Sequence, residues 1–130
     1  MAIPSGSGTE VLRRMGIYNQ GTSETQIDWA QAVQTTAANN SGTVAVPANV
    51  IITVLSILIT NRNTSNARLL DIIIDTTSNQ LQILKQQTVG GAETFVFSDK
   101  LVLREGDQLI FDSSDDAVDI RVEFIYQDWT

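Results

Sequence analysis

The segment Ala117–Tyr126, AVDIRVEFIY, has the clearest two-residue period in this chain of 130 residues. Side chains of a β-strand alternate between the two faces of a sheet, so this pattern predicts a strand with one buried face. The charged side chains Asp119, Arg121 and Glu123 are expected to face water. The residues expected to face the core are Val118, Ile120, Val122, Phe124 and Tyr126.

Short apolar runs separated by turn residues continue toward the amino end. Arg104–Asp107, Ser113–Asp116 and Gly90–Gly91 have the composition of turns, and no long helical pattern appears. These features predict an all-β fold, an antiparallel β-sandwich of jelly-roll type. The expected strands are Thr43–Val46, Val50–Thr60, Arg68–Thr76, Leu81–Lys85, Glu93–Phe97, Leu101–Leu103, Leu109–Asp112 and Ala117–Tyr126.

Val50–Thr60 differs from the last strand because it is apolar on both faces. Such a strand is either central to two packed layers or covered by a neighbouring subunit. Alternation would place Val50, Ile52, Val54 and Leu58 on one face. We expect the opposite face to pack in a cyclic homo-oligomer, such as a trimer, through Ile51, Leu55, Ile57 and Ile59.

The amino-terminal segment MAIPSGSGT, residues 1–9, has too little apolar surface to offset the entropy cost of ordering it. We expect residues 1–14 to form an extended arm that orders on a partner, and residues 15–130 to form a single sandwich domain. The period of Glu10–Ile17 does not distinguish a strand from a helical turn. The expected partner-binding residues of the arm are Ile3, Pro4, Val11, Leu12, Arg13 and Arg14.

The composition excludes several kinds of chemistry. The chain has no cysteine and no histidine, which removes disulfides, thiolate nucleophiles and metal sites built on these residues. A formal net charge of −7 disfavours binding to nucleic acid through a basic surface. The longest apolar run, residues 50–59, is about half the roughly 20 residues of a membrane-spanning helix. We expect a protein without catalytic activity, cofactor, nucleic-acid partner or membrane span.

Acidic residues near the carboxyl end are the one candidate metal site, since Ca²⁺ takes several carboxylate oxygens from a single loop. Their spacing does not match a calcium loop, and Asp and Ser are also the residues that hairpin turns select, so we favour a turn without metal. The candidates are Asp112, Asp115, Asp116 and Asp119.

Two further groups suggest binding or catalysis of sugars. Glu105 and Asp107 could act as acid and base on a glycosidic bond, although a chain with fifteen acids offers many such pairs. Aromatic rings could form a stacking platform for a sugar. We favour core or interface positions for these rings, which are Tyr18, Trp29, Tyr126 and Trp129.

Two segments resemble small virion proteins of tailed bacteriophages. They are VPANVIITVLSILITN, residues 46–61, and DKLVLREGDQLIFDSSDDAVDIRVEFIYQD, residues 99–128. The second segment has the family's order of a strand, an acid-Gly-Asp turn, a strand, a small polar turn and a last strand that begins with Val-Asp. The opening IPSGSGTEVLRR, residues 3–14, also resembles the amino end of phage structural proteins. Together the matched segments cover a little under half of the chain.

The resemblance implies a non-enzymatic virion structural protein, assembled in the host cytoplasm. We expect a capsid decoration, or cement, protein that binds the major capsid protein of the head shell through residues 1–14, with the sandwich outside. The alternatives are a neck or tail accessory or fibre-base protein of the virion, and a glycan-binding host-recognition module.

Overall fold

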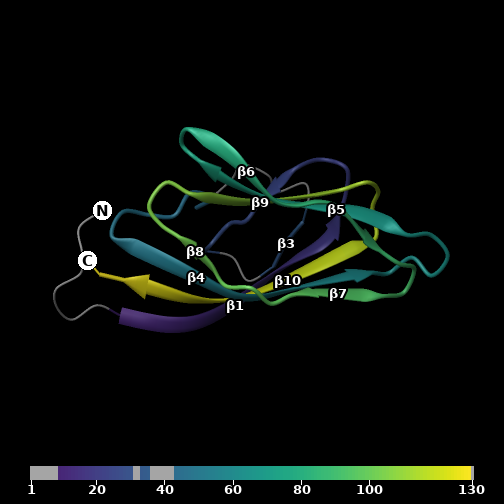
Figure 1. The fold of residues 1–130 in the computed structure, drawn as a ribbon. Helices are drawn as coiled ribbons and strands as arrows, with labels where there is room; N and C mark the ends of the chain where they lie inside the picture. The colour runs from purple at the N-terminus through teal and green to yellow at the C-terminus, as the bar shows by residue number, and fades with distance from the viewer. Residues whose placement is uncertain (1–8, 31–32, 36–42, 130) are drawn as a thin grey trace.

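A computed structural model describes residues 9–30, 33–35 and 43–129 and contains ten strands within these ranges. The larger sheet has the order β3-β1-β10-β4-β7, with β8 also paired to β4, and the smaller sheet has the order β2-β9-β5-β6. The sheets lie as two layers (Figure 1). The strands are β1 Thr9–Gln20, β2 Thr25–Gln26, β3 Val33–Thr35, β4 Val50–Asn61, β5 Arg68–Thr76, β6 Asn79–Val89, β7 Thr94–Phe97, β8 Leu101–Leu103, β9 Gln108–Ser113 and β10 Val118–Asp128.

The strands pair from the ends of the chain inward. β1 pairs with β10, β2 with β9, β4 with β7 and β8, and β5 with β6, all antiparallel. This nested order is that of a long hairpin rolled into two sheets, which is a jelly roll. The predicted fold class is therefore confirmed. The exception to the expected antiparallel pairing is β3, which runs parallel to β1.

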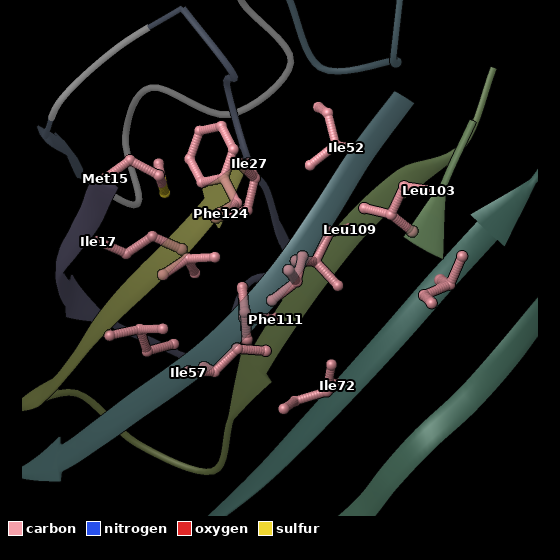
Figure 2. Packing of buried hydrophobic residues seen from close by; sticks show 14 of the residues in the cluster. Met15, Ile17, Ile27, Ile52, Ile57, Ile72, Leu103, Leu109, Phe111 and Phe124 are labelled. Atoms are coloured by element: carbon pink, nitrogen blue, oxygen red, sulfur yellow. The ribbon is translucent and has the colours of Figure 1, made fainter. Parts of the chain in front are cut away.

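The core lies between the two sheets and is almost entirely aliphatic, with Phe111 of β9 and Phe124 of β10 as its largest fully buried side chains (Figure 2). The alternation predicted for the last strand is confirmed. Val118, Ile120 and Val122 are buried, whereas Arg121 is exposed. Burial of this kind stabilises the fold by about 25 cal/mol for each Å² of apolar surface removed from water.

β4 contains one extra residue, Leu55, in its ladder with β10. Val54 lies opposite Phe124 and Ser56 lies opposite Glu123, so Leu55 is a β-bulge. A one-residue shift moves every following side chain to the other face of the sheet. Beyond the bulge, Ile57 therefore points into the core and the side chain of Leu58 points outward.

The bulge corrects the oligomer interface predicted from the sequence. Ile57 and Ile59 are fully buried within the subunit, at 0% exposure, so they cannot contact a second subunit. Ile51 and Leu55 do lie on the outer face of the larger sheet, where they are half-buried. Strict alternation failed because the apolar run contains no signal for the extra residue.

The predicted boundary between an arm and a domain at residue 14 has no counterpart in the structure. Residues 9–14 are the first half of β1 and continue its antiparallel ladder with β10, from Thr9 opposite Asp128 to Arg14 opposite Glu123. The ladder gives this segment backbone partners that an isolated arm would lack. Residues 1–8, including Ile3 and Pro4, lie outside the described residues.

The turn at Gly90–Gly91 joins two sheets and is not a hairpin within one. β6 belongs to the smaller sheet and β7 to the larger. The side chain of Asn61, fully buried at the end of β4, donates hydrogen bonds to the carbonyls of Asn66, Val89 and Gly90 at 2.8, 3.1 and 3.3 Å. This amide fixes the crossing between the layers.

Thr43–Val46 was predicted as a strand but does not form one. Val46 donates a backbone hydrogen bond to Asp107 at 2.9 Å and accepts one from Gly106 at 3.0 Å. Its side chain is buried. The segment therefore packs against the turn before β9, and Pro47 follows it directly.

The bulge predicts that truncation of two neighbouring aliphatic side chains lowers the free energy of unfolding by different amounts. Ile57→Ala should lower the free energy of unfolding by about 2–5 kcal/mol, because it leaves a cavity in the core. Leu58→Ala, on the outer face, should cost about 1 kcal/mol or less. Denaturant unfolding of the two purified variants measures both values. Equal costs would contradict the position of the bulge.

Candidate functional site

The acidic residues predicted as a candidate metal site are not gathered around one point. Asp119 forms an ion pair with Arg62 at 3.0 Å, and Asp115 lies 3.6 Å from the buried Arg68. The amide of Asp116 donates to the Asp115 carboxylate at 2.8 Å. Within the described ranges, no group of three or more Asp, Glu, His or Cys side chains could hold a metal ion.

Arg68 gives the acidic turn a structural role. It is almost buried, and its Nε donates to the carbonyl of Asp116 at 3.1 Å. The side chain therefore ties the turn after β9 to the start of β5, in addition to its ion pair with Asp115. This arrangement agrees with the prediction of a turn.

Asp112 is separated from the rest of the acidic turn and lines an open pocket of about 170 Å³ on the outer side of the smaller sheet. It lies directly opposite Asp71 in the β5–β9 ladder. Its Oδ1 atom is buried and has no hydrogen-bond partner. Loss of solvation by burial raises the pKa of Asp112 above 3.8, opposed by a hydrogen bond from the Ser113 backbone, while the charge of Asp71 raises it further.

Asp107, one member of the suggested catalytic pair, holds a turn. Its carboxylate accepts a hydrogen bond from the backbone of Arg104 at 3.1 Å, and its own amide donates to the Arg104 carbonyl at 3.0 Å. Gly106 between them has a φ of 88°, which glycine adopts without strain. The acid-Gly-Asp sequence is therefore explained by the turn that joins β8 and β9.

The aromatic residues do not form a common platform. Trp29 is 2% exposed, donates from Nε1 to the carbonyl of Val44 at 3.1 Å and packs edge-on against Phe124. Tyr126 is covered by the guanidinium of Arg13, 4.2 Å from its ring centre. A sugar cannot reach Trp29, so the preference for a core position is confirmed for this residue.

The other two aromatic residues, Tyr18 and Trp129, have partners of their own. Tyr18 is 54% exposed, and the guanidinium of Arg62 lies over its ring at 4.9 Å. The backbone of Trp129 donates to the carbonyl of Asn49 at 2.9 Å, just beyond the end of β10. Trp129 thus connects the end of the last strand to the turn before β4.

The predicted arm residues that the structure describes lie on two faces of β1. Leu12 is opposite Ile125, and Arg14 is opposite Glu123, both on the outer face of the larger sheet. Val11 and Arg13 alternate with them and lie on the opposite face, beside Tyr126. All four side chains are exposed.

The outer face of the larger sheet carries the three most exposed large aliphatic side chains of the described residues. Leu12 is 70% exposed, Val102 is 66% and Val96 is 54%. The ladder places Leu12, Ile125, Thr53 and Val102 in one row across β1, β10, β4 and β8. This side of the larger sheet is called the outer face below. Its aliphatic residues are Leu12, Ile51, Leu55, Leu58, Val96, Val102 and Ile125.

A polar row crosses the outer face between its apolar rows. Arg14, Glu123 and Ser56 lie side by side, and the Ser56 hydroxyl donates to the Glu123 carboxylate at 3.0 Å. The next row contains Arg121, 3.6 Å from Glu123, and Leu58 paired with Val96. The outer face therefore combines exposed leucine and valine with charged groups of both signs.

Sequence reasoning missed most of the outer face. It placed Leu58 on the wrong side of β4 and singled out neither Val96 nor Val102, because each of these valines is one residue in a short strand. The available signal was alternation within Thr94–Phe97 and Leu101–Leu103, where the central valine must point opposite to its two neighbours.

No protein-family model and no curated protein matches the chain. Among solved structures, a chain of the T13 IBDV viral particle is similar at a TM-score of 0.42 with 8% sequence identity, over 97% of this chain. The alignment spans 36% of that chain, so this protein corresponds to about a third of its length. A similarity of this size does not bear on function. The described residues include no helix that is long and apolar enough to cross a membrane.

The raised pKa of Asp112 predicts that replacing this carboxylate by an amide stabilises the fold, by an amount that depends on pH. Because its pKa is higher in the folded chain than 3.8, the ionised carboxylate is disfavoured by folding at neutral pH, and protonation relieves this cost. Asp112→Asn should therefore raise the melting temperature at pH 7. The gain should shrink as the pH falls through the raised pKa and vanish below 3.8.

Thermal unfolding followed by circular dichroism between pH 3 and pH 8 measures this effect. Asp116→Asn, in the exposed turn that follows, is the control for the removal of one carboxylate from this part of the chain. A lower melting temperature for Asp112→Asn at pH 7 would contradict the stated cost of burial.

Proposed function

We propose that this chain is a non-enzymatic structural protein of a virion, and specifically a capsid decoration protein of a tailed bacteriophage. The observation that carries the proposal is the outer face, on which Leu12, Val96 and Val102 expose more than half of their surface. Exposed large apolar side chains gathered on one side of a sheet are typical of a site of contact with other proteins. The resemblance of residues 46–61 and 99–128 to phage virion proteins supports the same class.

The jelly roll is compatible with this function but does not establish it. The architecture occurs in viral capsid proteins, lectins and cupins, and function resides in the surface that each fold carries. In this chain Trp29 is buried and Asp107 holds a turn, so neither supports a sugar-binding or hydrolytic role. The proposal assigns no catalytic residue and no cofactor.

Attachment to the head shell is assigned to the amino-terminal segment that precedes β1. Residues 1–8 include Ile3 and Pro4, and the chain continues directly into Val11 and Arg13 on the side of β1 beside Tyr126. A short segment tied to a rigid sheet gains avidity when several subunits bind one shell. The partner proposed for this segment is the major capsid protein.

Copy number separates decoration from the other virion positions. A decoration protein covers the head in hundreds of copies, whereas a neck, tail accessory or fibre-base protein occupies one ring or one vertex. Quantitative mass spectrometry of purified particles distinguishes these cases. Complete absence of the chain from purified particles would overturn the proposal of a virion protein.

The fold determines where the attachment segment can be truncated. Deletion of residues 2–14 would remove half of β1 and its ladder with β10, so loss of binding could reflect unfolding. Deletion of residues 2–8 leaves β1 complete, and it should preserve the melting temperature while strongly reducing binding to particles that lack the protein. Cosedimentation with such particles measures binding, and undiminished binding would reject this role for the segment.

A further inference from the structure

The two sheets of the sandwich differ in how far their outward apolar residues are covered. Ile73 of β5 and Ile110 of β9 alternate with core residues and point away from the core, yet they are only 4% and 1% exposed. The chain therefore buries them by itself. On the larger sheet, Leu12 and Val102 remain 70% and 66% exposed, more than Leu69 and Leu81 of the smaller sheet, which are 37% and 50% exposed.

Charge is distributed as unevenly as apolar surface. The outer face and its end carry three acids, Glu10, Asp119 and Glu123, and three bases, Arg14, Arg62 and Arg121, and are therefore neutral. The whole formal charge of −7 thus lies elsewhere on the chain. The smaller sheet includes Asp71, Asp75 and Asp112 on its outward side, with Lys85 beside Asp71.

This separation of charge selects the partner of the outer face. Two copies of a chain with net charge −7 repel each other when their acidic surfaces approach. The neutral outer face is where a second copy meets the least repulsion, and its mixed signs allow arginines of one copy to face glutamates of the other. A strongly basic partner would instead be drawn to the acidic surface of the smaller sheet.

We propose that the outer face of the larger sheet binds the outer face of a second copy of this chain. The contact buries Leu12, Val96 and Val102 of each copy, with Arg14 and Arg121 directed toward Glu10 and Glu123 of the other copy. This inference deepens the proposed function by naming a partner. It is tested with purified protein alone, so it can fail while the placement in a virion holds, and the reverse is also true.

A charge-swap experiment tests whether the occupant is the same chain. One variant carries Arg14→Glu and Arg121→Glu, and the other carries Glu10→Lys and Glu123→Lys, which makes the two outer faces negative and positive. Each variant alone should self-associate at least about tenfold more weakly than the unmodified chain, because like charges then meet across the contact. An equimolar mixture should recover the association. Sedimentation velocity measures all three samples.

A second pair of variants tests the apolar part of the contact. Leu12→Asp with Val102→Asp should abolish self-association. Leu81→Asp is the matched control, since Leu81 is 50% exposed but belongs to β6 of the smaller sheet, and it should leave self-association unchanged. Circular dichroism and melting temperature verify that every variant is folded.

Three results would overturn the inference. The first is an unmodified chain that stays monomeric at about 100 µM, a concentration that reveals even weak specific dimers. The second is equal loss of association in Leu81→Asp and in the Leu12/Val102 variant. The third is a charge-swapped mixture that remains monomeric although both variants are folded and the unmodified chain associates.

Discussion

Apolar contact between the inner faces of two sheets is the constraint that orders the rest of this molecule. Phe111 and Phe124 lie in that contact, and the strands that carry them must present every second side chain to it. β10 meets this requirement by plain alternation. β4 meets it only because Leu55 bulges, which lets Val54 and Ile57 both face inward although they are three residues apart. The packing of these inward side chains also determines which side chains of β4 point outward, and Leu58 is one of them.

The parts of the fold that could be predicted are those in which one strand carries its own signal. Ala117–Tyr126 alternates in sequence between apolar and polar residues, and the Gly106 turn has the residues that its backbone requires, so both could be predicted from sequence. The bulge at Leu55 was not, because its position depends on the pairing with Glu123 and Phe124 more than one half of the chain away. For a similar reason, the sequence does not decide between a strand and a helical turn over residues 10–17 of β1. Its residues are ordered by the ladder with β10, and a local period does not report a distant partner.

The candidate site shows the same limit more strongly. The acids of Asp112–Asp119 were predicted as a candidate metal site because they are close in sequence. In the structure Asp112 lies apart from Asp119, and Asp115 has the buried Arg68 as its partner. The outer face has the opposite character. Leu12 of β1 is more than 80 residues from Val96 and Val102 of β7 and β8, and only the sheet order brings β1 onto the same side as these two strands. Contiguity in space, which the sequence does not display, defines this surface.

The nested pairing of strands also has a consequence for how the chain is made. β1 is translated early, but its main partner, β10, is translated last of the ten described strands. Contacts between such distant segments close slowly, because the entropy of a long loop is lost before they form. The larger sheet therefore cannot be completed while β10 is still inside the ribosome. During that interval the edges of β1 and β4 that β10 later occupies have no partner strand from this ladder.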